Sequence, residues 1–224
     1  MPSTQEEIYS CVLSGDLETL QQHFQSESVT EEAREKDLFG EKDEVGRNAL
    51  FAACMLGRSA VVRELARNGA QVNEQTAGGY SSLHCAACWG HLETVRTLLD
   101  LGADTQAKTF RGERAVDLAT RYSHTDCADW LILAEAKQDL MSYISHVRDT
   151  ISDPEKIQGK LNKEDKNICT HACSAKSDWI QNVKNPMVSD FRAQRKHMED
   201  TLQPILTKLS AQPAESPAKA AGKV

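Results

Sequence analysis

Long hydrophobic runs are missing from this sequence of 224 residues. The longest uninterrupted apolar run, residues 49–56, is far shorter than the roughly 20 residues that a membrane-spanning helix needs. The first residues are acidic and lack the apolar core of a secretory signal, so we expect neither a membrane association nor export. Proline and glycine are scarce, with 6 and 12 residues, which excludes collagen-like and proline-rich disordered chains.

Concentrated positive charge is missing as well. The net charge is −7, and residues 1–45 hold three Lys and Arg against 12 Asp and Glu. We therefore expect no nucleic-acid-binding surface. The sequence also lacks a glycine-rich phosphate loop, a zinc-protease motif and a nucleophile elbow. Nothing in it indicates catalytic residues, a bound cofactor or a small-molecule substrate, so we expect a protein that is not an enzyme.

A repeat of 33 residues organises the first half of the chain. A shift of 33 aligns Gly57 with Gly90 and Ala70 with Ala103, within a stretch that holds nine identities in 25 positions. Chance would give about one or two identities, so the period is a property of the fold. A weaker third copy follows near residue 112. An N-terminal copy around residues 15–20 is set apart by a nine-residue insertion.

The stretch from Gly79 to Glu93 resembles the ankyrin repeat motif. In that motif Ser81 is placed to cap an inner helix, and Gly90 to end it in a left-handed conformation. The resemblance implies an all-α ankyrin solenoid of three repeats plus a degenerate N-terminal repeat. In the third repeat Ser123 replaces the glycine and Asp117 replaces the motif histidine, which predicts looser geometry there.

After residue 137 the period stops, and three amphipathic stretches follow, at residues 140–151, after Asn162 and at residues 188–209. Short amphipathic helices need tertiary partners, so we expect a small C-terminal helical bundle. Pro204 is expected to kink its last helix. The resulting division is residues 1–45 (degenerate repeat and acidic insertion), 46–138 (ankyrin repeats), 139–209 (bundle) and 210–224 (disordered tail).

Residues 153–166, with a further match through Cys173 and Trp179 to Leu209, resemble the lid helices of the 70-kDa heat-shock chaperones. The nucleotide-binding and peptide-binding domains of that family have no counterpart in the sequence. ATP-driven client cycling is therefore excluded, and the resemblance implies a docking or capping role for these helices.

A concave surface made by turns and inner helices is what the ankyrin resemblance implies for binding. Leu56, Trp89 and Tyr122 recur there at one structural position, and large apolar side chains repeated on a surface suggest a contact site. In the alternative, the segment 25–45 or the C-terminal helices fold across this surface and cover it. The residues that we assign to partner binding are Arg47, Met55, Leu56, Tyr80, Cys88, Trp89, Phe110, Arg111, Arg121 and Tyr122.

The seven cysteines form an odd number, which favours reduced thiols in a cytosolic chain. Cys85 and Cys88 lie close to His84 in the sequence, but a structural zinc site needs four ligands and no second cysteine pair has a suitable spacing. Cys169 and Cys173, four residues apart, lie on one face of the predicted helix, whereas His171 lies on another face. We therefore expect no metal site, while a thiol-reactive protein would require a lowered pKa for Cys88.

The sequence thus predicts a non-enzymatic intracellular adapter that binds a protein partner on the concave ankyrin face. The resemblances imply a cytoplasmic protein associated with cell division or the cytoskeleton. The alternatives are a regulator that contacts the chaperone machinery through residues 140–209, and a thiol or metal protein. Ser216, which precedes Pro217, is a weak phosphorylation signal.

Overall fold

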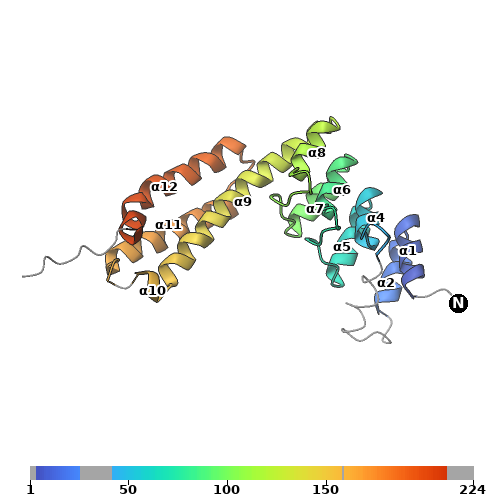
Figure 1. Cartoon of the computed structure of the whole chain (residues 1–224), viewed down its shortest axis with the longest axis horizontal. Coiled ribbons are helices and arrows are strands. Elements are labelled where there is room, and N and C mark those ends of the chain that lie inside the picture. Colours follow the sequence, from blue (N-terminus) through green and yellow to red (C-terminus); the bar gives the residue numbers. More distant parts are fainter. Residues whose placement is uncertain (1–3, 26–41, 158, 211–224) are drawn as a thin grey trace, which may run out of the picture. The chain divides into compact units, whose positions relative to one another are not determined.

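The computed structural model describes residues 4–25, 42–157 and 159–210, and every regular element in these ranges is a helix (Figure 1). A single β-bridge joins Gln75 and Ser81 within the same ranges. The chain divides into two compact units, with the boundary between Glu135 and Ala136. None of the described helices combines the length and the apolar composition that crossing a membrane requires. The predicted all-α solenoid followed by C-terminal helices is confirmed.

The first unit is a stack of helix pairs. Inner helices pack against inner helices and outer helices against outer helices of the neighbouring pair, as Figure 1 shows for this unit. Their apolar faces form one continuous core that includes Leu50, Leu65, Leu83 and Leu98, all fully buried. The pairs are α1 (Thr4–Ser14) with α2 (Leu17–Gln25), α4 (Ala49–Met55) with α5 (Ser59–Arg67), α6 (Ser82–Cys88) with α7 (Leu92–Asp100), and α8 (Ala115–Arg121) with the start of α9 (Thr125–Ser152).

The start of α6 confirms the predicted cap. The Ser81 hydroxyl accepts a hydrogen bond from the backbone N–H of His84, and His84 Nδ1 accepts one from the Ser81 backbone N–H at 3.1 Å. Because Nδ1 is an acceptor, Nε2 carries the proton and donates to the Glu113 carbonyl at 3.0 Å. The buried imidazole therefore ties α6 both to its own cap and to the turn of the next repeat.

The third repeat keeps the regular pattern where we predicted looser geometry. Asp117 stands in for the histidine, and its Oδ2 accepts the Arg114 backbone N–H at 2.8 Å. Ser123 adopts φ +61°, the left-handed conformation of Gly57 and Gly90. α8 consequently spans seven residues, like α4 and α6. The prediction was wrong because a serine can adopt this conformation at a modest energetic cost.

That cost gives a testable expectation for Ser123→Gly. Glycine reaches positive φ without a Cβ clash, so the variant should be more stable than the wild type by about 0.5–1 kcal/mol. Urea denaturation of the two proteins under identical conditions measures the difference. A Ser123→Ala variant is the control and should not gain stability, because it keeps the Cβ. A stability of Ser123→Gly at or below that of the wild type would contradict the expectation.

A second repeated contact fixes neighbouring repeats to one another. The glycine that follows an inner helix packs against the histidine that precedes the outer helix of the next repeat. Gly57, after α4, faces His91, which precedes α7, and Gly90, after α6, faces His124, which precedes α9. Each imidazole also bonds a carbonyl at the end of the inner helix of the preceding repeat. His91 Nε2 lies 2.9 Å from the Met55 carbonyl oxygen, and His124 Nε2 lies 3.0 Å from the Cys88 carbonyl oxygen in the same way.

The second unit contains the rest of α9 together with α10 (Pro154–Ile157), α11 (Lys163–Asn182) and α12 (Val188–Ser210). The predicted break at Asp153 and Pro154 and the predicted cap at Asn162 are confirmed, the latter as a capping box with Asp165. The first stretch does not begin at residue 140, however, because α9 runs without interruption from Thr125. The buried side chains of this unit include Leu140, Ile144, Val147, Cys169, Cys173, Phe191, Met198, Leu202 and Ile205.

Polar side chains complete the packing of the bundle. Arg195, which interrupts the apolar face of α12, lies over the Tyr143 ring at 3.7 Å and forms ion pairs with Asp139 and Glu199. Lys208 binds Asp165 at 2.7 Å, and this hydrogen bond lowers the pKa of the carboxyl. α12 continues through Pro204, so the expected kink stays a prediction. The predicted tail disorder and Ser216 lie outside the described residues.

Candidate functional site

Three large side chains lie at the end of successive inner helices. Leu56, Trp89 and Tyr122 are the C-terminal caps of α4, α6 and α8. The left-handed residue that follows each cap turns the chain away, so the side chain stays outside the core. These side chains are 45%, 57% and 52% exposed, respectively. The structure thus places the predicted trio on the surface of the repeat unit, at equivalent positions of successive repeats.

The turns that precede the inner helices share one construction. We call residues 43–47, 76–80 and 109–113 the finger turns. In each turn the first residue exchanges backbone hydrogen bonds with the fourth and fifth, as Thr109 does with Gly112 and Glu113. The side chain of the first residue also accepts backbone N–H groups, through Asp43, Thr76 or Thr109. These bonds hold the residues at the turn tips, which include Phe110 and Arg111, in a defined orientation.

Two aromatic rings lie next to each other on the second and third finger turns. A Cβ at Gly78 would lie 3.3 Å from the Tyr80 ring and 3.8 Å from the Phe110 ring, so both rings flank this glycine. The Phe110 backbone N–H donates to the Gly78 carbonyl at 2.9 Å. Phe110 is 70% exposed, and the Arg111 guanidinium lies 5.3 Å from its ring centre. The finger turns thus present an exposed aromatic group with a cation beside it.

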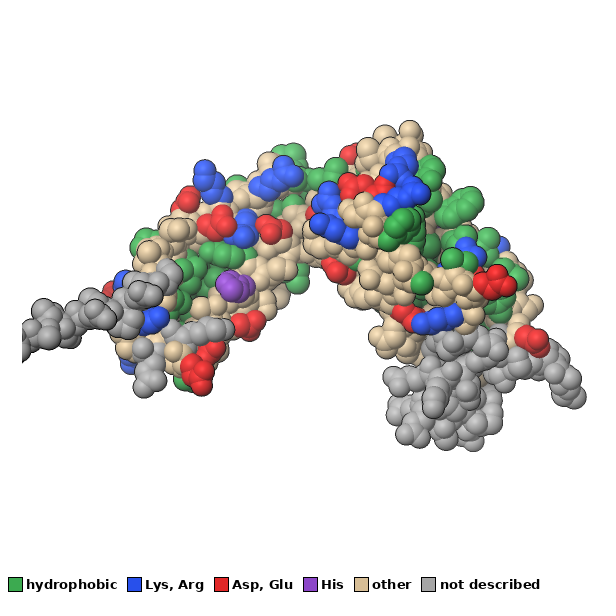
Figure 2. Space-filling view, in the orientation of Figure 1, with side chains coloured by type: hydrophobic (Ala, Val, Ile, Leu, Met, Phe, Trp, Pro, Cys, Tyr) green, Lys and Arg blue, Asp and Glu red, His purple; other side chains and the backbone are tan. Residues whose placement is uncertain are grey.

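The remaining predicted residues are partly engaged within the unit. Arg47 binds Asp43 Oδ2 at 2.7 Å and reaches the Met55 sulfur at 3.7 Å. Arg121 forms an ion pair with Glu113, which ties the end of α8 to the third finger turn. On the face of the repeat unit that Figure 2 shows, hydrophobic, basic and acidic side chains lie among one another. The surface is therefore mixed in character and offers both apolar and charged contacts.

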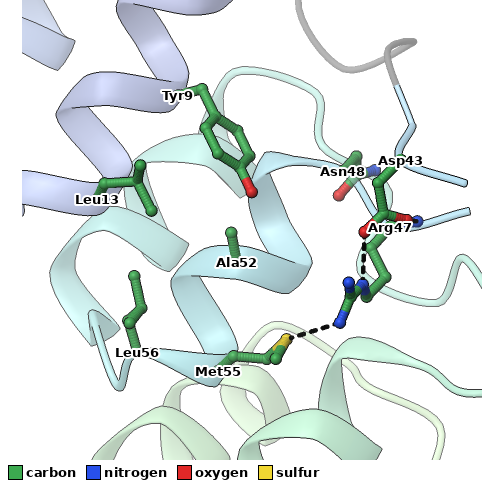
Figure 3. Close-up of a pocket in the computed structure, with 8 residues that line it drawn as sticks. All are labelled: Tyr9, Leu13, Asp43, Arg47, Asn48, Ala52, Met55 and Leu56. Carbon is green, nitrogen blue, oxygen red and sulfur yellow. Dashed lines mark hydrogen bonds and ion pairs between the residues drawn. The ribbon is translucent and has the colours of Figure 1, made fainter. Parts of the chain in front are cut away.

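A hollow between α1 and α4 is a part of this surface that the sequence analysis missed. Figure 3 shows Tyr9 and Leu13 of α1 facing Ala52, Met55 and Leu56 of α4. Its volume of about 180 Å³ is below the roughly 300–1,000 Å³ of small-molecule pockets and suits a single apolar side chain. The repeat alignment could have revealed Leu13, because a shift of 42 residues, the period of 33 plus the nine-residue insertion, matches Gly15 with Gly57 and Leu13 with Met55.

The cysteines do not have the features of a reactive or metal-binding set. Burial raises the pKa of Cys88, opposite to the direction that a thiol nucleophile requires, and burial raises the pKa of Cys85 to about 12. Cys169 and Cys173 are buried in α11, whereas His171 is exposed. Within the described ranges no group of three or more His, Cys, Asp or Glu side chains is placed to hold a metal ion.

The alternative in which the chain covers its own binding surface concerns residues 25–45 and the C-terminal helices. Most of the first segment, residues 26–41, lies outside the described residues. Of the predicted binding residues, Leu56, Trp89, Phe110 and Tyr122 are exposed, while Arg47, Met55, Tyr80 and Cys88 are half-buried.

Comparison with known proteins agrees with this architecture. A family model described as ankyrin repeats (3 copies) matches residues 8–109, which include the degenerate N-terminal repeat. Ankyrin repeats are modules for protein–protein interaction, so the chain has the build of an interaction adapter, and its family is typically non-enzymatic.

Three curated relatives match most of the chain, and each is named ankyrin repeat domain-containing protein 45. The protein from Danio rerio is 56% identical over 218 residues, which cover 96% of this chain and 97% of the relative. The human protein is 43% identical and the mouse protein 48% identical, each over 88% of this chain and over 74% and 80% of the relative. The chain therefore belongs to the family of ankyrin repeat domain-containing protein 45.

Proposed function

We propose that this protein is a non-enzymatic adapter that holds a protein partner on the concave face of its ankyrin repeats. We call the surface formed by Leu56, Trp89, Tyr122, the finger turns and the hollow beside α1 the concave face. The observation that carries the proposal is the exposure of three large side chains at equivalent positions. Solvent-facing positions favour polar groups, whereas an apolar patch flanked by charges is typical of protein contact sites.

The test is a double variant, Trp89→Ala/Tyr122→Ala, in the full chain. Aromatic residues at the centre of an interface often contribute more than 2 kcal/mol each, so partner binding should weaken by about 30-fold or more. Quantitative proximity labelling of wild type and variant identifies the partners that depend on the face, and titration of a purified partner gives the affinity. Circular dichroism of both proteins checks that the helices are retained.

The matched control is Met141→Ala/Met187→Ala, which removes two exposed apolar side chains from the second unit. This variant should keep the partners that the Trp89 and Tyr122 variant loses. If the folded Trp89→Ala/Tyr122→Ala protein keeps the complete set of wild-type partners, the assignment of binding to the concave face is wrong.

The finer part of the proposal concerns where this adapter works. The resemblance noted in the sequence supports a cytoplasmic protein associated with cell division or the cytoskeleton. Immunofluorescence of the endogenous protein through the cell cycle tests this. Diffuse staining at every stage, with no enrichment on a division structure or filament, would contradict it.

A second candidate function, regulation of the chaperone machinery, is favoured by an open groove in the second unit. The groove lies between α9 and α11, has a volume of about 540 Å³, and includes the apolar residues Met141, Ile144 and Ile180. The lid-like pattern of residues 153–209 supports a helix-binding role for it. Met141→Asp/Ile180→Asp in the full chain should abolish chaperone capture while leaving concave-face partners in place. If the wild type and Met141→Asp/Ile180→Asp capture the chaperone equally well, this candidate function is wrong.

A further inference from the structure

Basic charge is concentrated at one end of the concave face. The equivalent stretches that run from the residue before each finger turn to the C-terminal cap of its inner helix differ in charge. Residues 42–56 hold two Lys and Arg against two Asp and Glu, residues 75–89 hold none of either, and residues 108–122 hold four against two. The third repeat therefore presents a net positive patch in a chain whose net charge is −7.

Two of the four basic side chains in this patch are neutralised within the unit. Arg114 pairs with Asp117 and Glu135, and Arg121 pairs with Glu113. Lys108 and Arg111 are both exposed, and neither has an acidic partner among the residues that the structure describes. Arg111 instead lies against the Phe110 ring. These two cations are thus free to meet a charge from another molecule.

The free cations lie next to the apolar anchors of the same repeat. Phe110 and Arg111 lie in the third finger turn, and Lys108 directly precedes it. Phe110 is the most exposed large hydrophobic side chain of the described residues. The ion pair between Arg121 and Glu113 brings the end of α8, and with it Tyr122, close to this turn. The Cys88 thiol, which precedes Trp89, lies close to Arg121 and Tyr122. Burial raises its pKa, and against this larger effect a hydrogen bond with the Tyr122 side chain and the charge of Arg121 each act to lower it. These contacts link Trp89 and Tyr122, through Cys88 and Arg121, to the third finger turn, which carries Phe110 and Arg111 and directly follows Lys108.

We propose that the partner binds this area through a short acidic segment in which Asp or Glu residues lie beside an aromatic or aliphatic anchor. The carboxylates meet Lys108 and Arg111, and the anchor packs against Phe110, Trp89 and Tyr122. The proposal rests on the function proposed above and specifies the chemistry of the partner. The Arg111 guanidinium lies 5.3 Å from the Phe110 ring centre, and an extended chain advances about 3.3 Å per residue, so the acid and the anchor lie within about three residues of each other.

Complementary charge favours a protein segment over a nucleic acid. Phosphate backbones are bound by many cations at once, with six to ten contacts in typical complexes, whereas this patch offers two free ones. A pair of cations beside an apolar anchor is better matched to one or two carboxylates, and such charge pairs set the specificity and the association rate of an interface.

The test uses a random peptide library displayed on phage and selected against four full-length proteins. These are the wild type, Trp89→Ala/Tyr122→Ala, Lys108→Glu/Arg111→Glu, and the control Lys184→Glu/Lys196→Glu, which changes the net charge equally on exposed positions of the second unit. The wild type and the control should enrich peptides with Asp or Glu within about three residues of an aromatic or aliphatic residue. Lys108→Glu/Arg111→Glu should bind these peptides at least tenfold more weakly and enrich Lys and Arg instead.

The remaining outcomes separate the two proposals. Peptides that need Trp89 and Tyr122 but show no acidic preference would overturn the acidic-segment proposal and leave the proposed function in place. Peptides that bind Trp89→Ala/Tyr122→Ala as well as the wild type would overturn the proposed function. Enrichment of no peptide, or binding of a fluorescent single-stranded RNA that is lost in Lys108→Glu/Arg111→Glu, would also overturn the acidic-segment proposal.

Discussion

Gly57→Ala should destabilise the repeat unit by about 3 kcal/mol. Gly57 has φ +69°, and a Cβ added there would lie 2.6 Å from His91 Nδ1. The left-handed backbone costs a non-glycine residue about 1 kcal/mol, and overpacking against a fixed ring adds about 1–3 kcal/mol. The imidazole cannot retreat easily because its other nitrogen is bonded to the Met55 carbonyl. Urea denaturation followed by tryptophan fluorescence measures the loss, in a Trp179→Phe background that leaves Trp89 and Trp130 as reporters of this unit.

Gly102→Ala is the matched control for this prediction. Gly102 also has a positive φ, +84°, but an added Cβ there would meet nothing within 4 Å. Its cost should therefore be limited to the backbone term of about 1 kcal/mol. In a double-mutant cycle, His91→Ala should relieve most of the extra cost of Gly57→Ala. If Gly57→Ala and Gly102→Ala cost the same, the ring contact has no energetic role.

Acidification from pH 6.5 to pH 4 should lower the stability of the repeat unit by about 3 kcal/mol through His84. Burial lowers the pKa of His84 from 6.5 to about 4, although the carboxylates of Asp117 and Asp104 oppose this shift. The unfolded chain therefore takes up a proton near pH 6.5, whereas the folded chain does so only near pH 4. Stability is fully present above pH 6.5 and falls across this window by about 1.4 kcal/mol for each unit of the pKa difference.

The variant His84→Asn isolates this contribution. Its side-chain oxygen can accept the Ser81 backbone N–H as Nδ1 does, but the bond to the Glu113 carbonyl is lost. We expect a cost of about 1–2 kcal/mol at pH 7. The difference between wild type and variant should shrink as the pH falls and reverse between about pH 6 and pH 5, where the loss through His84 equals the cost of the substitution, because the variant has no proton to take up. Urea denaturation at pH 7, 5.5 and 4.5 in the Trp179→Phe background tests this. A difference that stays constant with pH would show that His84 does not titrate in this window.

The parts of the fold that depend on local sequence patterns were predictable. The 33-residue period predicted the stacking of the repeats. Ser81 and Asn162 predicted where two helices begin, because a capping side chain bonds backbone groups within three residues of itself. The recurrence of Leu56, Trp89 and Tyr122 at one position of the repeat likewise predicted that these side chains lie outside the core. The helix starts are decided by neighbours in the sequence, and the stacking and the exposed positions by the recurrence of one pattern.

The features that the sequence did not predict depend on helix continuity and on contacts that the repeat pattern does not determine. α9 is continuous because residues 125–152 contain neither proline nor glycine, whereas the end of the 33-residue period suggested a boundary inside it. The regular geometry of the third repeat depends on Asp117 finding the Arg114 backbone, which the ankyrin motif does not contain. The pairing of Arg121 with Glu113 and the hollow lined by Tyr9 arise from three-dimensional packing, which no periodic pattern encodes.

The serine at position 123 also bears on how the solenoid can grow. At Gly57 and Gly90 the space beside the missing Cβ is filled by the imidazole of the following repeat. Ser123 carries a Cβ into the equivalent space, so an additional module joined after the third repeat would collide with it. Elongation by duplication is thus closed at this end unless Ser123 first mutates to glycine, whereas a copy of residues 58–90 begins and ends with compatible residues and can be inserted internally.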